Sequence, residues 1–257
     1  MQNLLARDIV IALAAFAAGA INSLAGGGTL LSFPALVWIG VNPVMANATN
    51  SFALWPGSFA AMVGFRHDMA NIRRWLLFLT IPAFAGGAVG AVLLLHTSMT
   101  TFTHLVPFLI LGATLLLAAQ ELITRRLGRV AHAHENPTAG WITVVFVFQF
   151  LVGIYGGYFG GGIGILILAA LGLIGLTDMH EMNGLKNLLA ICINGVAAIY
   201  FAFSGAVIWK DGFIMAVAAV IGGYLGARIA RRLGRTFVRR AVVLIGLCMG
   251  IALFFKR

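Results

Sequence analysis

The chain has 257 residues, of which 61% are hydrophobic and only 9% are charged, and its mean hydropathy is +1.01. Soluble domains carry about 25% charged residues, and a soluble core could not hide this much apolar surface from water. The formal net charge of +10 does not indicate nucleic-acid binding, because the basic residues lie in short segments between apolar runs, where they set membrane orientation. The composition therefore predicts a protein of the lipid bilayer.

Ten apolar segments follow one another along the chain. They cover approximately residues 9–25, 28–41, 44–65, 72–95, 101–123, 140–158, 161–176, 182–203, 210–230 and 237–255. The alternation typical of a transmembrane barrel is absent, so we expect an all-α polytopic membrane protein. Segments 28–41 and 161–176 would span roughly 20 Å as helices, less than the ~30 Å hydrocarbon core, which predicts broken or re-entrant helices.

The first apolar segment also resembles a signal peptide. The residues before it carry no net positive charge, because Arg7 is offset by Asp8, whereas a signal peptide begins with a positively charged region. Its sequence counterpart in the second half is internal. We therefore expect a helix of the mature protein.

Two glycine phrases recur in the two halves of the chain. AGGGTL at residues 25–30 is echoed by FGGGIG at 159–164, and GGAVGA at 86–91 is echoed by GGYLGA at 222–227. These echoes predict two repeats of five segments, residues 1–124 and 140–257, joined by a cytoplasmic linker at 125–139. An odd number of segments per repeat inverts the second repeat in the membrane. Gly86, Gly90, Gly222 and Gly226 are expected to serve helix packing.

The basic residues predict the orientation. Thirteen of the 17 lie in the odd-numbered loops: Arg66, Arg73, Arg74, Arg125, Arg126, Arg129, Lys186, Arg228, Arg231, Arg232, Arg235, Arg239 and Arg240. The even-numbered loops and the termini hold Arg7, Lys210, Lys256 and Arg257. Positively charged loops stay in the cytoplasm, so we expect a bacterial inner-membrane protein with both termini on the outer side.

The two glycine triplets are candidates for a substrate site near the middle of the membrane. A helix N-terminus carries unpaired N–H groups and partial positive charge, and glycines let an anion approach them. The alternative is that the triplets only allow tight helix packing. Lys186 would neutralise the anion, unless it extends to the membrane surface instead. The candidate binding residues are Asn22, Ser23, Gly26, Gly27, Gly28, Thr29, Asn47, Thr49, Asn50, Ser51, Tyr155, Tyr158, Gly160, Gly161, Gly162, Asn183, Lys186, Asn187 and Asn194.

The whole set of motifs resembles the sulfite exporter TauE/SafE family, also called the TSUP family. The resemblance rests on NSLAGGGTLLSFPAL at 22–36, NATNS at 47–51, the Arg66–Trp75 boundary, GGAVGA, and their counterparts in the second half. It implies a permease for sulfur-containing anions: sulfite, thiosulfate, or sulfonates such as sulfoacetate. One departure is Ile163, which stands where the first half has Thr29, so the two half-sites differ chemically.

The expected function is export of such an anion, driven by the inside-negative membrane potential. Import of the same anions and a membrane assembly role without transport remain alternatives. A cation or metal transporter is disfavoured, because the acids counted near apolar segments are only Asp8, Glu121, Asp178 and Glu181. An enzyme is not expected, since no nucleophile motif or paired aspartate is found. We also expect no cofactor and no metal. The expected partners are the anion and the lipid bilayer, not nucleic acid, and a homodimer is left open.

Overall fold

The structure, a computed structural model, describes residues 2–24, 27–63, 73–133, 138–176, 178–233 and 235–255. These ranges are helical, with no strand among them. The helices are α1 (Gln2–Leu24), α2 (Thr29–Trp38), α3 (Pro43–Val63), α4 (Arg73–His96), α5 (Met99–Ala133), α6 (Ala139–Tyr158), α7 (Ile163–Leu173), α8 (Met179–Phe203), α9 (Trp209–Leu233) and α10 (Arg235–Phe255). Each predicted apolar segment corresponds to one helix, so the all-α fold class is confirmed.

Five helices of the described chain are long and apolar enough to cross a membrane: those with apolar stretches at Leu5–Asn22, Leu77–His96, Met99–Ile123, Gly140–Tyr158 and Glu181–Phe203. The helices after the two glycine triplets are short, with 10 residues in α2 and 11 in α7. Helix α5 differs from the expected segment because it continues past residue 123 to Ala133. This extension is rich in arginine, which favours water over lipid.

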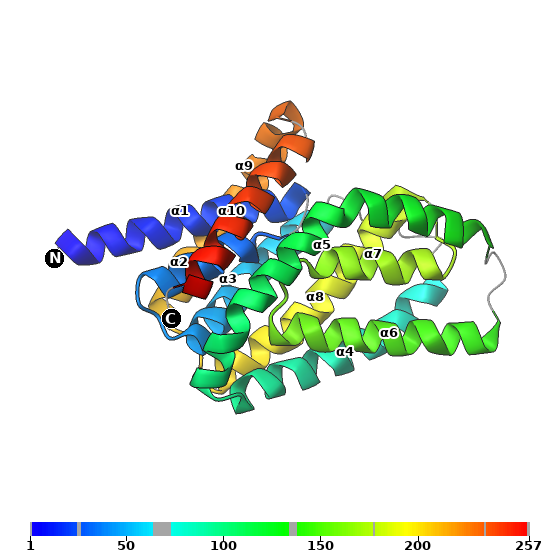
Figure 1. The fold of residues 1–257 in the computed structure, drawn as a ribbon, viewed down its shortest axis with the longest axis horizontal. Helices are drawn as coiled ribbons and strands as arrows, with labels where there is room; N and C mark the ends of the chain where they lie inside the picture. The colour runs from blue at the N-terminus through cyan, green and yellow to red at the C-terminus, as the bar shows by residue number, and fades with distance from the viewer. Residues whose placement is uncertain are drawn as a thin grey trace.

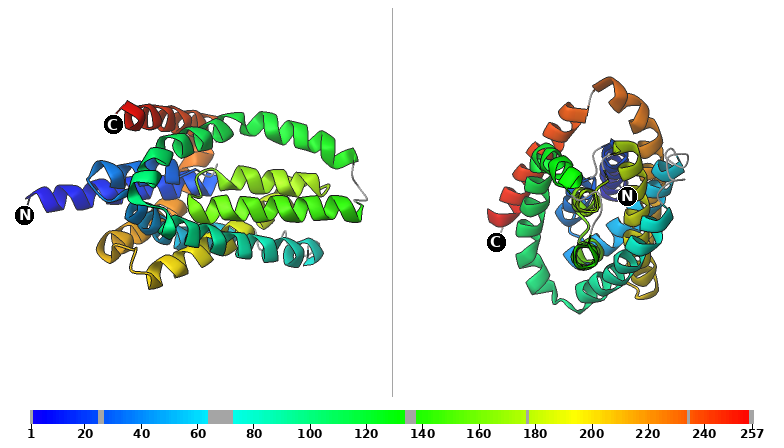
Figure 2. Two further views of the ribbon diagram at one scale, coloured as in Figure 1. Left: turned by 60° about the horizontal axis from the view of Figure 1, so that its bottom comes forward. Right: turned by 90° about the vertical axis from the view of Figure 1, so that its right-hand side faces the viewer.

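The long helices form an elongated bundle (Figures 1 and 2). One end, here called the termini end, holds the start of α1, the end of α10 and the α4–α5 and α8–α9 connections (Figure 1). The opposite end, here called the linker end, holds the end of α5 and the start of α6 (Figure 1). Large apolar side chains such as Leu13, Ile81, Phe84, Leu115 and Val217 are exposed on the outside of the bundle. A lipid environment accounts for such a surface, which water would disfavour.

Two helix crossings are made by direct backbone contact. A Cβ atom at Gly86 of α4 would collide with the Phe150 carbonyl oxygen of α6, and one at Gly222 of α9 would collide with the Phe16 carbonyl oxygen of α1. Gly86 and Gly222 are 136 positions apart, and Phe16 and Phe150 are 134 apart. The α4–α6 and α1–α9 crossings are therefore built in the same way.

A second glycine pair repeats this relation. A Cβ at Gly153 of α6 would approach the Ala83 carbonyl oxygen, and one at Gly19 of α1 would collide with the Ala219 carbonyl oxygen. Gly90 of α4 is equally close to the Ile154 carbonyl oxygen. The packing role expected for Gly86, Gly90 and Gly222 is thus confirmed, whereas the surroundings of Gly226 lie outside the described part.

Valine at Gly86 or Gly222 should therefore destabilise the protein. The new side chain meets rigid backbone of the neighbouring helix, so the helices must separate, at a cost of about 1–3 kcal/mol or more. Gly112 of α5 is the matched control, because a Cβ there would meet no atom within 4 Å. Thermal unfolding of detergent-purified Gly86→Val, Gly222→Val and Gly112→Val should show a lower Tm for the first two only. Equal Tm values for all three would contradict this account of the crossings.

Candidate functional site

The chain leaves regular helix at both glycine triplets. At the first, α1 ends at Leu24 and α2 begins at Thr29, with Gly27 at φ +92°. At the second, α6 ends at Tyr158 and α7 begins at Ile163, with Gly160 at φ +76° and Gly162 at +71°. Positive φ in this region is strained for residues other than glycine. Both breaks therefore depend on glycine, as expected for broken helices.

Side chains from α1 and α2 hold the first break. Asn22 Oδ1 accepts a hydrogen bond from the Gly28 N–H at 2.7 Å, which occupies one amide at the start of α2. Ser32, in the next turn of α2, donates to Asn50 Oδ1 of α3 at 2.5 Å. Asn50 is 1% exposed and Ser32 is fully buried, so this bond joins α2 to α3 inside the protein.

Residues from both halves hold the second break. The Tyr155 hydroxyl donates to the Gly161 carbonyl oxygen at 2.6 Å. Asn47 of α3 donates through Nδ2 to the Tyr158 carbonyl oxygen at 2.8 Å. A carbonyl at the end of a helix has no partner within that helix, and Asn47 supplies one here.

A cavity of about 90 Å³ lies between the two breaks. On this scale a single water needs about 10–15 Å³, so the space suits several waters or one small solute. Its lining combines backbone at the breaks with polar side chains and a few apolar groups. The lining residues are Gly19, Asn22, Gly27, Thr29, Ser51, Leu54, Gly57, Ser58, Phe159, Gly160, Ile163, Gly164, Lys186, Asn187, Ala190, Asn194 and Ala219.

Lys186 is the charged residue among the described residues that line the cavity. Its Nζ donates to Asn183 Oδ1, one turn earlier on α8, at 3.0 Å. The aliphatic part of the side chain passes over Gly164 in the first turn of α7, where an added Cβ would lie 3.3 Å from the Lys186 Cδ. The absence of a side chain at Gly164 thus leaves room for Lys186 to reach the second break.

Eight of the residues predicted for the site line this cavity: Asn22, Gly27, Thr29, Ser51, Gly160, Lys186, Asn187 and Asn194. They come from four helices and from both glycine breaks. Sequence reasoning did not single out Ser58, although it lies seven residues after Ser51 on α3 and therefore on the same helical face. It also passed over Gly164, which directly follows the second triplet.

The other predicted residues are not among those that line the cavity. Thr49 Oγ1 accepts the Ile208 N–H at 3.0 Å, and the Tyr158 hydroxyl donates to Thr97 Oγ1 at 3.3 Å. Gly28, Asn47, Asn50, Tyr155 and Gly161 make the bonds given above, Gly162 caps the start of α7, and Asn183 holds Lys186. Gly26 and the side chain of Ser23 lie outside the described residues.

No group of three or more His, Cys, Asp or Glu residues suited to a metal ion occurs in the described part of the chain. Its two cysteines, Cys192 and Cys248, are unpaired thiols. The polar groups that line the cavity are amides, hydroxyls, backbone groups and one ammonium, which are groups that form hydrogen bonds and charge interactions.

Comparison with known proteins identifies the family of this chain. The family described as "Sulfite exporter TauE/SafE" matches residues 11–253. A "Probable membrane transporter protein" from Haemophilus influenzae is 30% identical over 241 residues, which cover 91% of this chain and 89% of the relative. A "Probable membrane transporter protein YfcA" from Escherichia coli K12 is 29% identical over 250 residues, with 96% and 89% covered. No solved structure gives a significant match.

The family match covers nearly all of the chain, including both glycine breaks and the helices that line the cavity. A family and relatives of this kind place the protein in a lipid bilayer, as the composition and the exposed apolar side chains require. The chain belongs to the sulfite exporter TauE/SafE family, and it is a membrane transporter rather than an enzyme.

Proposed function

We propose that the protein exports a small sulfur-containing anion, such as sulfite, thiosulfate or a sulfonate like sulfoacetate, across the bacterial inner membrane. The observation that carries this proposal is the cavity between the two glycine breaks, with Lys186 as its charged residue. The name of the family supports sulfite as a substrate. The anion class is also supported independently by the chemistry of the lining.

The lining offers several hydrogen-bond donors to an oxyanion. Asn22, Asn187 and Asn194 carry amide groups, and Ser51 and Ser58 carry hydroxyls. The first turns of α2 and α7 contribute backbone N–H groups and the positive ends of their helix dipoles. Together with the Lys186 ammonium, these groups can surround an anion with several oxygens. A cation would instead be repelled by the Lys186 ammonium.

We further propose that residues 1–124 and 140–257 are inverted repeats. The glycine contacts support this, since Gly86 meets Phe150 as Gly222 meets Phe16, and Gly153 meets Ala83 as Gly19 meets Ala219. Short helices α2 and α7 then begin at related points and approach the cavity from opposite sides.

The direction of transport follows from the charges and the membrane potential. Arginine-rich helix ends such as the α5 extension would lie in the cytoplasm, which places the linker end inside and both termini outside. An anion that moves outward through a potential of ~100 mV, negative inside, gains ~2.3 kcal/mol per charge. Export therefore needs no ATPase domain.

Sulfite and sulfoacetate flux in proteoliposomes tests the function directly. An imposed potential, negative on the cytoplasmic side, should speed outward flux, and the reversed potential should slow it. Inward flux that is favoured under every potential would support import instead. Protein that is monodisperse and correctly inserted but carries neither anion would indicate an assembly role without transport.

Replacing Lys186 should weaken anion binding without unfolding the protein. A hydrogen bond to a charged group contributes about 1.5–3 kcal/mol, so Lys186→Gln should raise the Kd for sulfite by roughly tenfold or more. Lys186→Arg should retain part of the affinity, because the charge remains while the shape differs. Calorimetric titration of purified variants measures both. A normal Kd for Lys186→Gln would mean that Lys186 serves the membrane surface and not the anion.

Replacing Gly27 in the first half, or Gly160 in the second half, with alanine should by itself abolish anion binding. Both residues line the cavity and have positive φ, so a Cβ strains each break and shifts the backbone groups that would bind the anion. Gly205 is a matched control, since its φ is also +76° and an added Cβ there meets nothing within 4 Å. Gly205→Ala should lose a similar amount of stability yet bind sulfite normally. Normal binding by Gly27→Ala and Gly160→Ala would place the anion site elsewhere.

Cysteine labelling tests the orientation. In a variant with Cys192→Ala and Cys248→Ala, a cysteine at Ser98, which is exposed between α4 and α5, should react with an impermeant maleimide added to intact cells. A cysteine at Arg235, at the start of α10, should react only after permeabilisation. The opposite pattern would reverse the proposed topology.

A further inference from the structure

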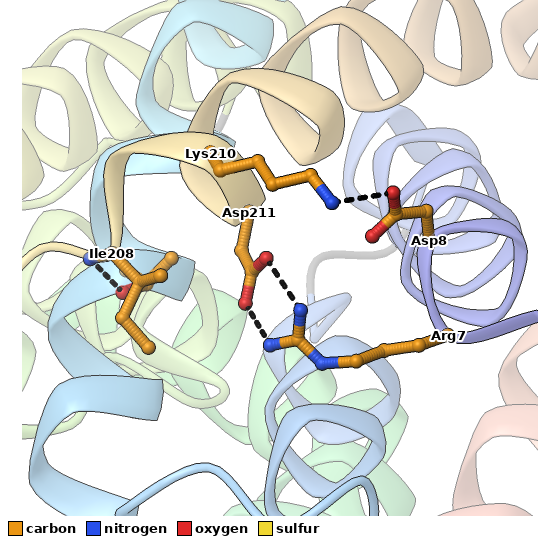
Figure 3. Close-up of polar contacts among 6 residues, drawn as sticks. Arg7, Asp8, Ile208, Lys210 and Asp211 are labelled. Atoms are coloured by element: carbon orange, nitrogen blue, oxygen red, sulfur yellow. Dashed lines mark hydrogen bonds and ion pairs between the residues drawn. The ribbon is translucent and has the colours of Figure 1, made fainter. Parts of the chain in front are cut away.

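Two crossed ion pairs join α1 to α9 at the termini end (Figure 3). The Arg7 guanidinium donates two bonds to the Asp211 carboxylate, at 3.1 Å to Oδ1 and 2.5 Å to Oδ2. The Lys210 ammonium donates to Asp8 Oδ2 at 2.7 Å. Each helix thus supplies one acid and one base from adjacent positions, and the four side chains form a single cluster, here called the α1–α9 charge cluster.

The cluster is partly buried and incompletely satisfied. Asp211 is fully buried, while the side chains of Arg7, Asp8 and Lys210 are 28%, 25% and 57% exposed. The second carboxylate oxygen of Asp8 is buried and has no hydrogen-bond partner among the described residues. A buried carboxylate such as that of Asp211 is strongly unfavourable without its partner unless water reaches it. The cluster is therefore stable while this end is closed, and its separation requires water to enter.

The same two helices also line the cavity, farther along their length. Gly19 lies 12 residues after Arg7, or about 18 Å along α1, and Ala219 lies eight residues after Asp211, or about 12 Å along α9. Ile11, Ala15 and Met215 occupy the intervening part, and all three are fully buried. At the termini end, α1 and α9 thus meet through charged pairs on the outside and through apolar side chains beneath them. This contact between α1 and α9 is here called the seal.

The contacts of α1 differ on the two sides of this seal. Near the cavity, α1 and α9 touch through backbone at Gly19 and Gly222, which fixes their distance. Near its start, α1 exposes Leu5, Ile9 and Leu13, and Figure 1 shows this part projecting from the bundle. Among the described residues, the charge cluster forms the polar contact between this projecting part and α9.

The related α6–α4 crossing lacks this arrangement at the matching positions of α6. The residues 134 positions after Arg7 and Asp8 are Trp141 and Ile142, and the Trp141 indole donates to the Leu173 carbonyl oxygen at 2.7 Å. Leu173 lies in the same half of the chain as Trp141. The charge cluster, in contrast, joins a helix of the first half to a helix of the second.

From these observations we propose that the α1–α9 charge cluster is the gate of the termini end: it is closed in this structure and separates when the cavity opens to that side. This inference rests on the proposed transport function, because a gate is needed only where a site faces the two sides alternately. Separation would pivot at the glycine contacts and would expose Arg7 and Asp211 to water together.

The test measures access to the cavity from each side of the membrane. A cysteine at Ser51 serves as the reporter in the variant with Cys192→Ala and Cys248→Ala, and an impermeant maleimide is added to cells or to inside-out vesicles. Arg7→Gln should raise the labelling rate from the termini side at least about tenfold and lower it from the linker side, since a gate shifts a two-state population. The exchanged pair Arg7→Asp with Asp211→Arg should restore the parent rates.

Two further variants keep the result interpretable. Arg239 pairs with Glu121 at 2.8 Å and also joins the two halves, through α10 and α5, so Arg239→Gln controls for loss of any ion pair and should leave labelling unchanged. If Arg7→Gln does not fold, Asp8→Asn with Lys210→Gln removes the more exposed pair and should shift labelling in the same direction. Equal labelling in these variants and in Arg239→Gln would overturn the gate.

Labelling needs no substrate, so the gate and the proposed function can fail separately. Parent protein that carries no sulfite in proteoliposomes, while the labelling shifts occur, would refute the substrate and leave the gate. Normal sulfite flux without any labelling shift would refute the gate and leave the function.

Discussion

The structure depends on one constraint: a helix that stops in the interior of a protein leaves backbone N–H and C=O groups that need hydrogen-bond partners. Both glycine breaks leave such groups, and specific side chains bind them. Asn22 accepts from the Gly28 N–H, Tyr155 donates to the Gly161 carbonyl oxygen, and Asn47 donates to the Tyr158 carbonyl oxygen. Within a bilayer, non-helical backbone is tolerated only where protein or a polar cavity surrounds it. The breaks therefore occur together with the side chains that bind their backbone groups and with the polar cavity between them.

Glycine also makes the close helix crossings possible. Van der Waals contact, without a hydrophobic driving force, holds membrane helices together. At Gly86 and Gly222 the neighbouring backbone lies where a side chain would be, so α4–α6 and α1–α9 pack as closely as helices can. Toward the start of α1, the charge cluster with Arg7 and Asp211 also joins α1 to α9. Close packing and the charge cluster are thus complementary ways of joining the halves.

Sequence reasoning predicted the ten helices, the two breaks and the packing glycines, because hydropathy and glycine spacing act locally. It was wrong about the acids near apolar segments, since it left out Asp211, which is fully buried at the start of α9. The sequence shows Asp211 beside Lys210 and Trp209, a pattern typical of a solvated helix start. In the fold, Arg7, 204 residues away in the sequence, pairs with the buried Asp211 carboxylate. The sequence also did not show which polar residues face the cavity. Thr49 and Ser51 are near neighbours, yet Thr49 accepts the Ile208 N–H just before α9, while Ser51 lines the cavity.

The charged residues of the cavity and of the α1–α9 charge cluster have different surroundings. Lys186 brings an ammonium to the cavity, whereas Arg7 and Lys210 at the termini end each contact an aspartate. In a medium of low dielectric constant an ammonium attracts an anion more strongly than it does in water. In the proposed mechanism the cavity would favour a bound anion, while the paired charges at the termini end would present little net charge to it. Opening of that end would let water weaken both sets of interactions, and the anion would then be released.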